Sequence, residues 1–363
     1  MAVSRAVSAS KRRGFLVNLA LLVTSTGLAL LLGEVSLQLL GWRPLYVSPE
    51  RDRFWRYDPL LGWAHEPGQE GIFEARQFRT HVRINQAGLR DREHTYDRPD
   101  GVKRILVVGD SFAWGYGVED ADRFSQRLES MPGVEVINAG VSGYSTDQEL
   151  LWLTNEGVKY EFDLVILALT GNDLGDNHRD LVNTIYYKPR FVNDEGQLTL
   201  VGYPVPRTNL PGKLIYHLSQ RSALTYFLVQ RYFDLLALNA SRKQPSPGGS
   251  QPGPGVNAAG QPFELTIALL DEIRGIAESG QAEFMIVATD RWWNGPTGTS
   301  FPEFIEALEA ADFPVLDVEA LPGFELEAMV IPGDGHWNSA GHAFVADALK
   351  TVIETKDLLG ETR

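Results

Sequence analysis

Short apolar runs alternate along most of the chain with longer segments in which apolar residues recur at helical spacing. The first run, residues 104–108, begins at Arg104, continues as Ile-Leu-Val-Val and stops abruptly at Gly109. A short β-branched run of this kind is typical of a strand buried on both faces of a parallel sheet. By the same criterion, further strands are predicted at residues 134–137, 164–169, 284–288 and 315–318.

The segments between these strands carry the 3.6-residue period of helices. Helices are predicted to begin within residues 124–128 and to cover residues 146–157, 263–279 and 339–355. This alternation of strands and helices predicts an α/β fold with a doubly wound, mainly parallel, five-stranded sheet of the flavodoxin-like type. We place this domain at residues 102–358.

Residues 41–101 are rich in aromatic, Arg and turn residues, and we expect them to pack on the main domain as an N-terminal extension. Residues 78–84 alternate apolar and polar positions, which predicts an edge strand, and Gly88 can supply the positive φ of a turn directly after it. Trp55, Trp63 and Arg90 could either pack against the main domain or bind a sugar.

The strand and helix rhythm breaks between about residues 176 and 261, which we interpret as an insertion. Residues 214–238 are predicted to be helical and are apolar on more than one face, so they could cover the site as a lid, touch a membrane or extend the core. Residues 244–261 are mostly Pro, Gly, Ser and Gln, a composition that predicts a mobile loop.

Residues 15–32 carry no charge and are just long enough to cross a hydrocarbon core. Lys11, Arg12 and Arg13 precede this run and should stay cytoplasmic by the positive-inside rule. Residues 1–40 are therefore predicted to form a basic tail and a single-pass anchor in the inner (cell) membrane, with the main domain periplasmic or extracellular. A cleaved signal peptide is the competing interpretation.

Composition narrows the possible chemistry. The 363 residues carry a formal net charge of −14, which argues against nucleic acid as a partner. The chain has no cysteine, so disulfides, thiolate catalysis and cysteine-containing metal sites are excluded.

Ser111 follows the first predicted strand, at the edge of the sheet where ligands of open α/β folds bind. It could act as a nucleophile or simply cap a helix. A nucleophilic serine needs a base, and His336 is the candidate because it lies between the last strand and the final helix. His342 lies inside that helix and is expected to pack or cap, and His178 is a second candidate.

Four separated segments of the chain resemble the conserved blocks of the SGNH (GDSL-like) serine hydrolase family, in its bacterial, membrane-anchored form. They are Gly-Asp-Ser-Phe at residues 109–112, Asn-Ala-Gly-Val-Ser-Gly at 138–143, Gly-Asn-Asp at 171–173 and Asp-Gly-His-Trp-Asn at 334–338. The resemblance covers roughly residues 51–355. It implies the family's α/β fold and its reaction, the hydrolysis of esters, without a cofactor or a metal.

The resemblance also assigns roles to individual residues. It implies a catalytic triad of Ser111, His336 and Asp334, and an oxyanion hole formed by the backbone N–H groups of Ser111 and Gly140 with the side-chain amide of Asn172. The family usually places the acid three residues before the histidine, where this chain has Gly333. Asp334 stands two residues before it, so its contact with His336 is an open question.

We therefore expect a membrane-bound serine esterase that removes acetyl or similar acyl groups from an acylated small molecule or a cell-envelope glycan. One alternative is an O-acyltransferase that uses the same residues, and another is a glycan-binding protein without catalysis. Metal catalysis by Asp110, Asp173 and Asp334 is a weaker rival, since nothing in their spacing requires an ion.

Overall fold

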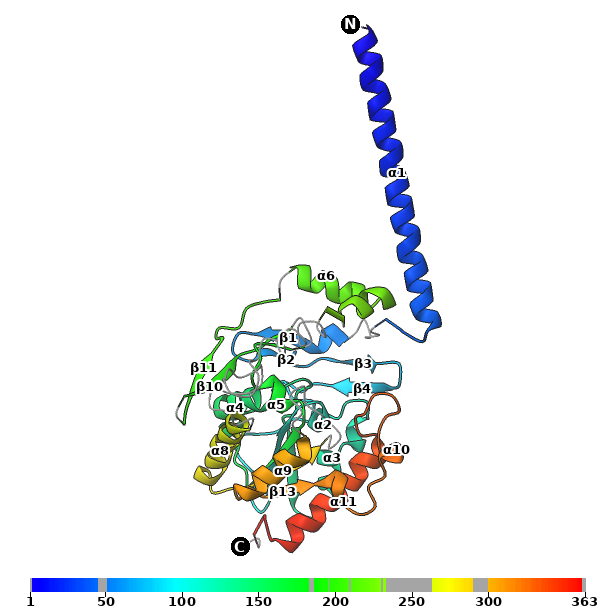
Figure 1. Cartoon of the computed structure of the whole chain (residues 1–363). Coiled ribbons are helices and arrows are strands. Elements are labelled where there is room, and N and C mark those ends of the chain that lie inside the picture. The colour runs from blue at the N-terminus through cyan, green and yellow to red at the C-terminus, as the bar shows by residue number, and fades with distance from the viewer. Residues whose placement is uncertain are drawn as a thin grey trace, which may run out of the picture. The chain divides into compact units, whose positions relative to one another are not determined.

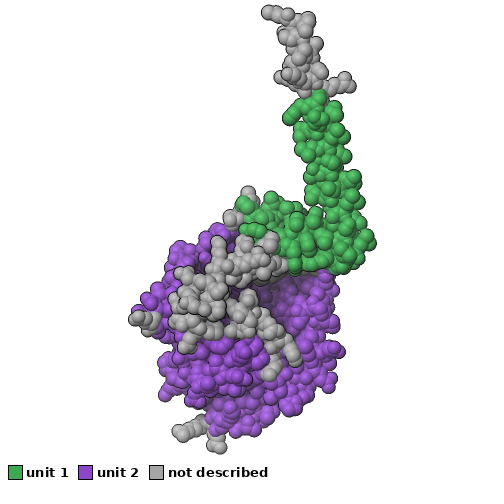
Figure 2. Space-filling model, viewed as in Figure 1, with its two compact units in different colours: residues 1–46, 210–238 green, residues 47–209, 239–363 purple. Residues whose placement is uncertain are grey.

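The computed structural model describes residues 2–44, 51–182, 186–194, 196–208, 210–229, 231–232, 263–289 and 300–360. The predicted loop at 244–261 lies outside these residues. The chain forms two compact units (Figure 2). Unit 1 comprises Met1–Tyr46 and Leu210–Leu238, and unit 2 comprises Val47–Asn209 and Asn239–Arg363.

The elements of both units are labelled in chain order (Figure 1). The strands are β1 (Trp55–Asp58), β2 (Gly62–His65), β3 (Glu70–Glu74), β4 (Arg79–Arg83), β5 (Lys103–Gly109), β6 (Val134–Asn138), β7 (Leu164–Thr170), β8 (Leu181–Val182), β9 (Tyr186–Tyr187), β10 (Arg190–Asp194), β11 (Gln197–Val201), β12 (Glu283–Thr289) and β13 (Val315–Asp317). The α-helices are α1 (Ala2–Leu39), α2 (Ser111–Trp114), α3 (Phe124–Leu128), α4 (Thr146–Asn155), α5 (Asp173–Asp176), α6 (Leu210–Ser219), α8 (Glu264–Ser279), α9 (Phe301–Ala310), α10 (Leu326–Met329) and α11 (Ser339–Thr355).

Unit 2 is built on a five-stranded sheet in the order β13-β12-β7-β5-β6. Each neighbouring pair in it is parallel. The predicted doubly wound sheet is confirmed, with each strand within one residue of its expected ends. The chain passes from β5 to β6 and then returns to the other side of β5 to form β7, so the strand order reverses between β5 and β7. That reversal is where open α/β sheets bind their ligands.

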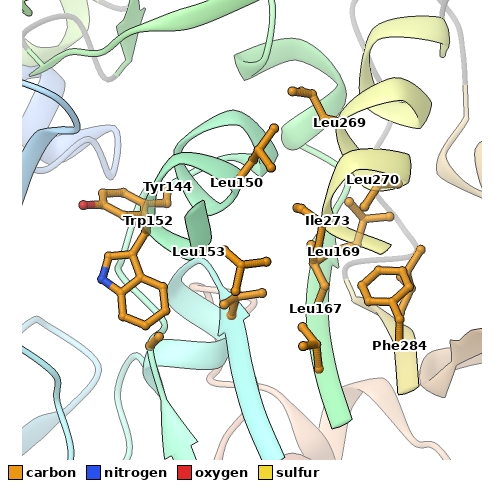
Figure 3. Packing of buried hydrophobic residues seen from close by; sticks show 14 of the residues in the cluster. Tyr144, Leu150, Trp152, Leu153, Leu167, Leu169, Leu269, Leu270, Ile273 and Phe284 are labelled. Carbon is orange, nitrogen blue, oxygen red and sulfur yellow. The ribbon is translucent and has the colours of Figure 1, made fainter. Parts of the chain in front are cut away.

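Both faces of the sheet are covered, which explains why its strands are apolar throughout. Leu167 and Leu169 of β7 point to one face and pack with residues of α4 and α8, such as Leu153 and Ile273 (Figure 3). The alternate residues of β7, including Ile166, point to the opposite face, where side chains of α3 and α11 complete a second core. The helices therefore form a layer on each side of the sheet.

From residue 47 on, the N-terminal extension belongs to unit 2, and it contains two hairpins, β1 with β2 and β3 with β4. The predicted edge strand at 78–84 is β4, which pairs antiparallel with β3. The Arg90 side chain is fully buried and donates hydrogen bonds to the carbonyls of Trp114 (3.1 Å), Gly115 (2.7 Å) and Val118 (2.7 Å). These contacts agree with the packing interpretation of Arg90 and leave it no surface with which to bind a sugar.

Unit 1 contains α1, α6 and a further helical segment at residues 223–229. The single helix predicted for residues 214–238 is wrong, because a turn at residues 220–221 separates α6 from the next helical segment. The Ser222 hydroxyl then accepts a hydrogen bond from the Thr225 amide (3.0 Å), as expected where a new helix begins. Within α1, Gly14–Leu39 is long and apolar enough to cross a membrane.

Candidate functional site

The turn after β5 presents Ser111 at the reversal of strand order. Gly109 has a φ of 153°, and a Cβ at this position would lie within 2.9 Å of the Cβ atoms of Ala113 and Ala168, so only glycine fits. Asp110 caps α2 by accepting a hydrogen bond from the Phe112 amide (2.9 Å). The capping role considered for Ser111 therefore belongs to Asp110, and Ser111 is the first residue of the helix.

Ser111, His336 and Asp334 form a continuous chain of polar contacts. The Ser111 Oγ lies 2.7 Å from Nε2 of His336, and Nδ1 of His336 lies 2.5 Å from Oδ1 of Asp334. A second, longer contact joins the Ser111 hydroxyl to Oδ2 of Asp110 at 3.3 Å. The hydroxyl has one proton, and the shorter contact directs it to His336. A neutral imidazole held in this way can accept the serine proton.

A tight loop explains how an acid only two residues before the histidine reaches its ring. Gly335 has a φ of 102°, which turns the backbone so that Oδ1 of Asp334 also faces the His336 amide at 3.3 Å. The helix that follows is capped by Asn338, whose Oδ1 accepts from the amides of Ala340 and Gly341. Asp334 therefore does not cap α11, and its carboxylate contacts the imidazole of His336 instead.

The charge of Asp334 is stabilised by the same contact. Burial is the largest influence on this carboxyl group and favours its neutral form. Hydrogen bonds from His336 and the charge of the imidazolium act in the opposite direction and together hold the pKa of Asp334 below its ordinary value. The group is therefore ionised beside the imidazole at neutral pH.

Two aromatic rings flank the imidazole of His336. The Phe112 ring lies 4.9 Å from it at an interplanar angle of 35°, and the Tyr116 ring lies 4.4 Å from it at 31°. Tyr116 in turn makes edge contacts with Phe73 and Phe78, which come from the β3–β4 hairpin. The extension thus packs against Tyr116, which in turn packs against His336. Nothing in the sequence pattern predicts these ring contacts.

The oxyanion donors that the resemblance implies differ in whether their N–H groups are already hydrogen-bonded. The Gly140 amide donates to Oδ1 of Asn138 at 2.9 Å, so it is already paired in this structure, and its role as an oxyanion donor stays a prediction. Gly140 is also required for space, since a Cβ would lie 2.5 Å from the Trp114 nitrogen. The Asn172 side-chain amide, at the end of β7, donates one hydrogen bond to Asp176 (3.2 Å) and retains a second N–H.

Other backbone amides are available in the turn after β5 and in the loop after β6. Among the hydrogen bonds of the described residues, the N–H groups of Ser111, Ser142 and Gly143 have no acceptor. Gly143 has a φ of 83° and, like Gly140, belongs to the segment that resembles the family's second block.

The remaining candidate residues lie apart from this chain of contacts. His342 is buried, and its Nδ1 accepts a hydrogen bond from the Phe124 amide (3.2 Å), which confirms that it packs. His178 follows α5, and Nε2 of its ring is buried without a hydrogen-bond partner in the described part of the chain. Burial and nearby cations, of which Arg190 is the strongest, lower the pKa of His178. Within the described residues, no group of three or more His, Asp or Glu side chains could hold a metal ion.

A group of buried carboxyl groups surrounds the ends of β5 and β7, and of these the sequence analysis singled out only Asp110 and Asp173. Burial raises the pKa of Asp110, and it raises those of Glu149 and Asp173 well above their ordinary values, helped by the negative charges nearby. Lys188 lies 2.5 Å from Asp147 in a fully buried ion pair. Burial nevertheless raises the pKa of Asp147 to about 6. The cluster draws its residues from separate segments of the chain, with Asp147 and Glu149 in the first turn of α4, so periodicity alone could not reveal it.

One segment of the chain matches the model of a known protein family. Residues 107–188 match the model of the GDSL-like Lipase/Acylhydrolase family. This segment includes Ser111, Gly140 and Asn172 and stops before Asp334 and His336. Among proteins with curated descriptions, none matches the chain.

Several solved structures are similar at low identity. A member of the lipolytic protein G-D-S-L family from Veillonella parvula DSM 2008 is 15% identical, with a TM-score of 0.38, covering 70% of this chain and 99% of that one. The psychrotrophic esterase EstA from Pseudoalteromonas sp. is 11% identical, with a TM-score of 0.39, covering 70% and 98%. A two-domain esterase active on acetylated mannans is 12% identical, with a TM-score of 0.37, covering 72% and 50%.

The matched segment holds the end of β5, the turn after it and Ser111. Over residues 107–188 the chain is therefore similar to the GDSL-like Lipase/Acylhydrolase family, and this match supports ester hydrolysis as its reaction.

Proposed function

We propose that the protein is a serine esterase in which Ser111 attacks the acyl carbon and His336 takes the serine proton. Asp334 orients the imidazole and stabilises the imidazolium that forms. The observation that carries this proposal is the continuous chain from Ser111 Oγ to Nε2 of His336 (2.7 Å) and from Nδ1 to Asp334 (2.5 Å). This arrangement also argues against a degraded, purely glycan-binding site.

The oxyanion would be held by the Ser111 amide and the Asn172 side chain. The third donor that the resemblance implies is the Gly140 amide, which Asn138 occupies in this structure, and the Gly143 amide, unpaired in the described hydrogen bonds, is the alternative in the same loop. Donors aimed at the developing negative charge are typically the largest single contribution to acyl-transfer catalysis.

The chemistry then follows two steps. The Ser111 oxygen forms a bond to the acyl carbon while His336 takes its proton, and the leaving alcohol departs with that proton. Water repeats the sequence on the acyl-enzyme, with His336 again as base, and releases the carboxylic acid and free Ser111.

We further propose that α1 anchors the protein in the cell membrane, with unit 2 on the outer side. Lys11, Arg12 and Arg13 before the apolar run support this orientation. From this location we infer that the substrate is an acyl ester, such as an acetyl group, on a cell-envelope glycan. Transfer of the acyl group to a sugar hydroxyl in place of water would use the same residues.

The test compares the full chain in detergent with two variants, using p-nitrophenyl acetate and an acetylated polysaccharide. Ser111→Ala should abolish hydrolysis and labelling by a fluorophosphonate while leaving the thermal transition nearly unchanged. The matched control is Ser130→Ala, because Ser130 is exposed on the surface. Labelling that survives in Ser111→Ala would show that another serine is the nucleophile.

A further inference from the structure

A helix of unit 1 is attached to the C-terminal end of the apolar helix α1. The Glu34 carboxylate accepts hydrogen bonds from the Ser222 hydroxyl (2.8 Å) and from the amides of Ala223 and Leu224 (both 2.9 Å). The first N–H groups of a helix have no partner inside it, so Glu34 serves as the cap of the helical segment at residues 223–229. A carboxylate at that end also interacts favourably with the helix dipole.

Apolar and aromatic contacts extend this attachment. A Cβ at Gly33 would lie 3.5 Å from a Leu224 methyl group, so this side of α1 approaches the helix closely. The Trp42 ring meets the Phe227 ring edge-on at 4.9 Å, and the Arg231 guanidinium lies over both rings. Contacts from residue 33 to residue 42 therefore fix the helix at the end of α1.

The helical pair formed by α6 and residues 223–229 and 231–232, here called the insertion hairpin, exposes five large apolar side chains. On α6, Leu214 and Leu218 are one turn apart and Ile215 follows Leu214, so the three side chains fall within one apolar stripe about 100° wide. The exposed fractions are 57% for Leu214, 45% for Ile215, 45% for Leu218, 55% for Leu228 and 58% for Tyr232.

The charge of the insertion hairpin also differs from that of the chain. Residues 210–232 contain Lys213, Arg221 and Arg231 and no Asp or Glu, although the whole chain has a formal charge of −14. Exposed apolar residues combined with cations are the features that bind a helix to the interface of an anionic bilayer.

We propose that the insertion hairpin lies on the outer surface of the membrane in which α1 is anchored, with its apolar face among the lipid headgroups. The inference rests on the proposed anchor. The uncharged residues 15–32 would span about 27 Å at 1.5 Å per residue. Gly33 and Glu34 then reach the lipid surface, and Glu34 holds the hairpin at that depth. Lys213, Arg221 and Arg231 would meet anionic headgroups.

The absence of native cysteine makes a direct test simple. Full-length protein with a single introduced cysteine is labelled with a fluorophore and reconstituted in phosphatidylcholine vesicles with added phosphatidylglycerol. The three positions are Leu218→Cys on the hairpin, Val23→Cys in the span and Lys350→Cys on α11. Lipids with doxyl groups near the headgroup or deep in the chains then serve as quenchers.

We expect headgroup-level quenching at position 218, deep quenching at position 23 and none at position 350. Quenching at 23 without quenching at 218 would overturn the inference and leave the anchor intact. A blue-shifted, unquenched label at 218 would show that protein, such as a second copy of the chain, covers this face instead. Absence of quenching at 23 would refute the anchor itself, and the inference with it.

A charge variant tests the proposed lipid chemistry separately. In the protein labelled at position 218, removal of phosphatidylglycerol should reduce quenching. The combined change Lys213→Gln and Arg221→Gln should abolish that dependence on anionic lipid. Quenching that depends on phosphatidylglycerol equally in both proteins would contradict the assigned role of these cations.

Discussion

The Tyr116 ring packs 4.4 Å from the imidazole of His336, and the two rings are inclined by 31°. Because an aromatic face attracts a cation, this contact favours the imidazolium that forms during acyl transfer, by about 0.5–2 kcal/mol for cation–π pairs in general. Tyr116→Leu should therefore lower kcat by up to roughly 30-fold and move the acid limb of the kcat/KM profile to lower pH. Tyr116→Phe keeps the ring and should retain both properties. Equal losses in the two variants would show that the ring does not act on His336.

Asp334→Asn should slow hydrolysis by roughly 10²-fold, since the variant can no longer stabilise the charged imidazole, and positioned acid–base groups contribute about 10²–10⁴-fold. Loss of the carboxylate disfavours the imidazolium, so the acid limb should also move to lower pH. Measurement of kcat/KM against pH tests both effects. Asp347→Asn, at an exposed position of α11, is the control. A variant with normal activity and an unmoved acid limb would reduce the proposed triad to Ser111 and His336.

Asn172→Ala should lower kcat by about 10²–10³-fold and change KM much less, because its amide would act on charge that develops in the transition state. Asn172→Asp should be at least as damaging, since a carboxylate repels the oxyanion. Steady-state kinetics with a small ester provide the measurement. An unaltered kcat in either variant would assign Asn172 to the turn after β7 alone.

Two buried histidines should each make unit 2 less stable in acid, whereas the raised pKa values of the buried Asp147, Glu149 and Asp173 act in the opposite direction. Burial lowers the pKa of His65 from 6.5 to about 4 and that of His342 to about 3. Both pKa values are lower in the folded state, so the stabilisation is complete above pH 6.5. As pH falls, the unfolded chain binds the protons first, and each group removes up to about 1.4 kcal/mol per pH unit until its folded pKa is reached.

The measurement is urea unfolding between pH 7 and pH 4. His342→Leu should be less stable than the wild type at neutral pH, because the Phe124 amide loses its acceptor, and its stability should depend less on pH. Parallel curves for the two proteins would show that His342 does not titrate with unfolding.

Local patterns were sufficient to predict the central sheet. The strand at residues 104–108 and its partners are apolar because both sheet faces are covered, so each could be recognised from its own composition. The proximity of Ser111 and His336 also followed from the fold, since both come after strands at one sheet edge. The contact of Asp334 did not, because it depends on the positive φ of Gly335, which spacing alone does not encode.

Other features depend on contacts between distant segments. The Asn138 side chain captures the Gly140 amide, and a resemblance between short motifs cannot show which amides are already paired. The break near residue 220 coincides with four consecutive polar residues, Ser-Gln-Arg-Ser at 219–222, but the apolar residues on both sides of them favoured a single helix. Tyr116 reaches His336 only because the β3–β4 hairpin packs behind it, and no periodicity reports such a contact.

The burial of Arg90 bears on how the protein can be divided. A fragment beginning at residue 102 would contain every residue of the proposed triad, yet it would lack the guanidinium that binds three backbone carbonyls in the turn after α2. The Gly115 carbonyl also accepts from the Val118 amide (3.2 Å), so the carbonyls of Trp114 and Val118 would be the ones left without a donor. Each such loss costs about 1–3 kcal/mol, a large share of the stability of an ordinary domain. The alternating pattern of strands and helices begins at β5, but an independently folding unit does not begin there. Recombination or truncation at that point should yield an unfolded, inactive product.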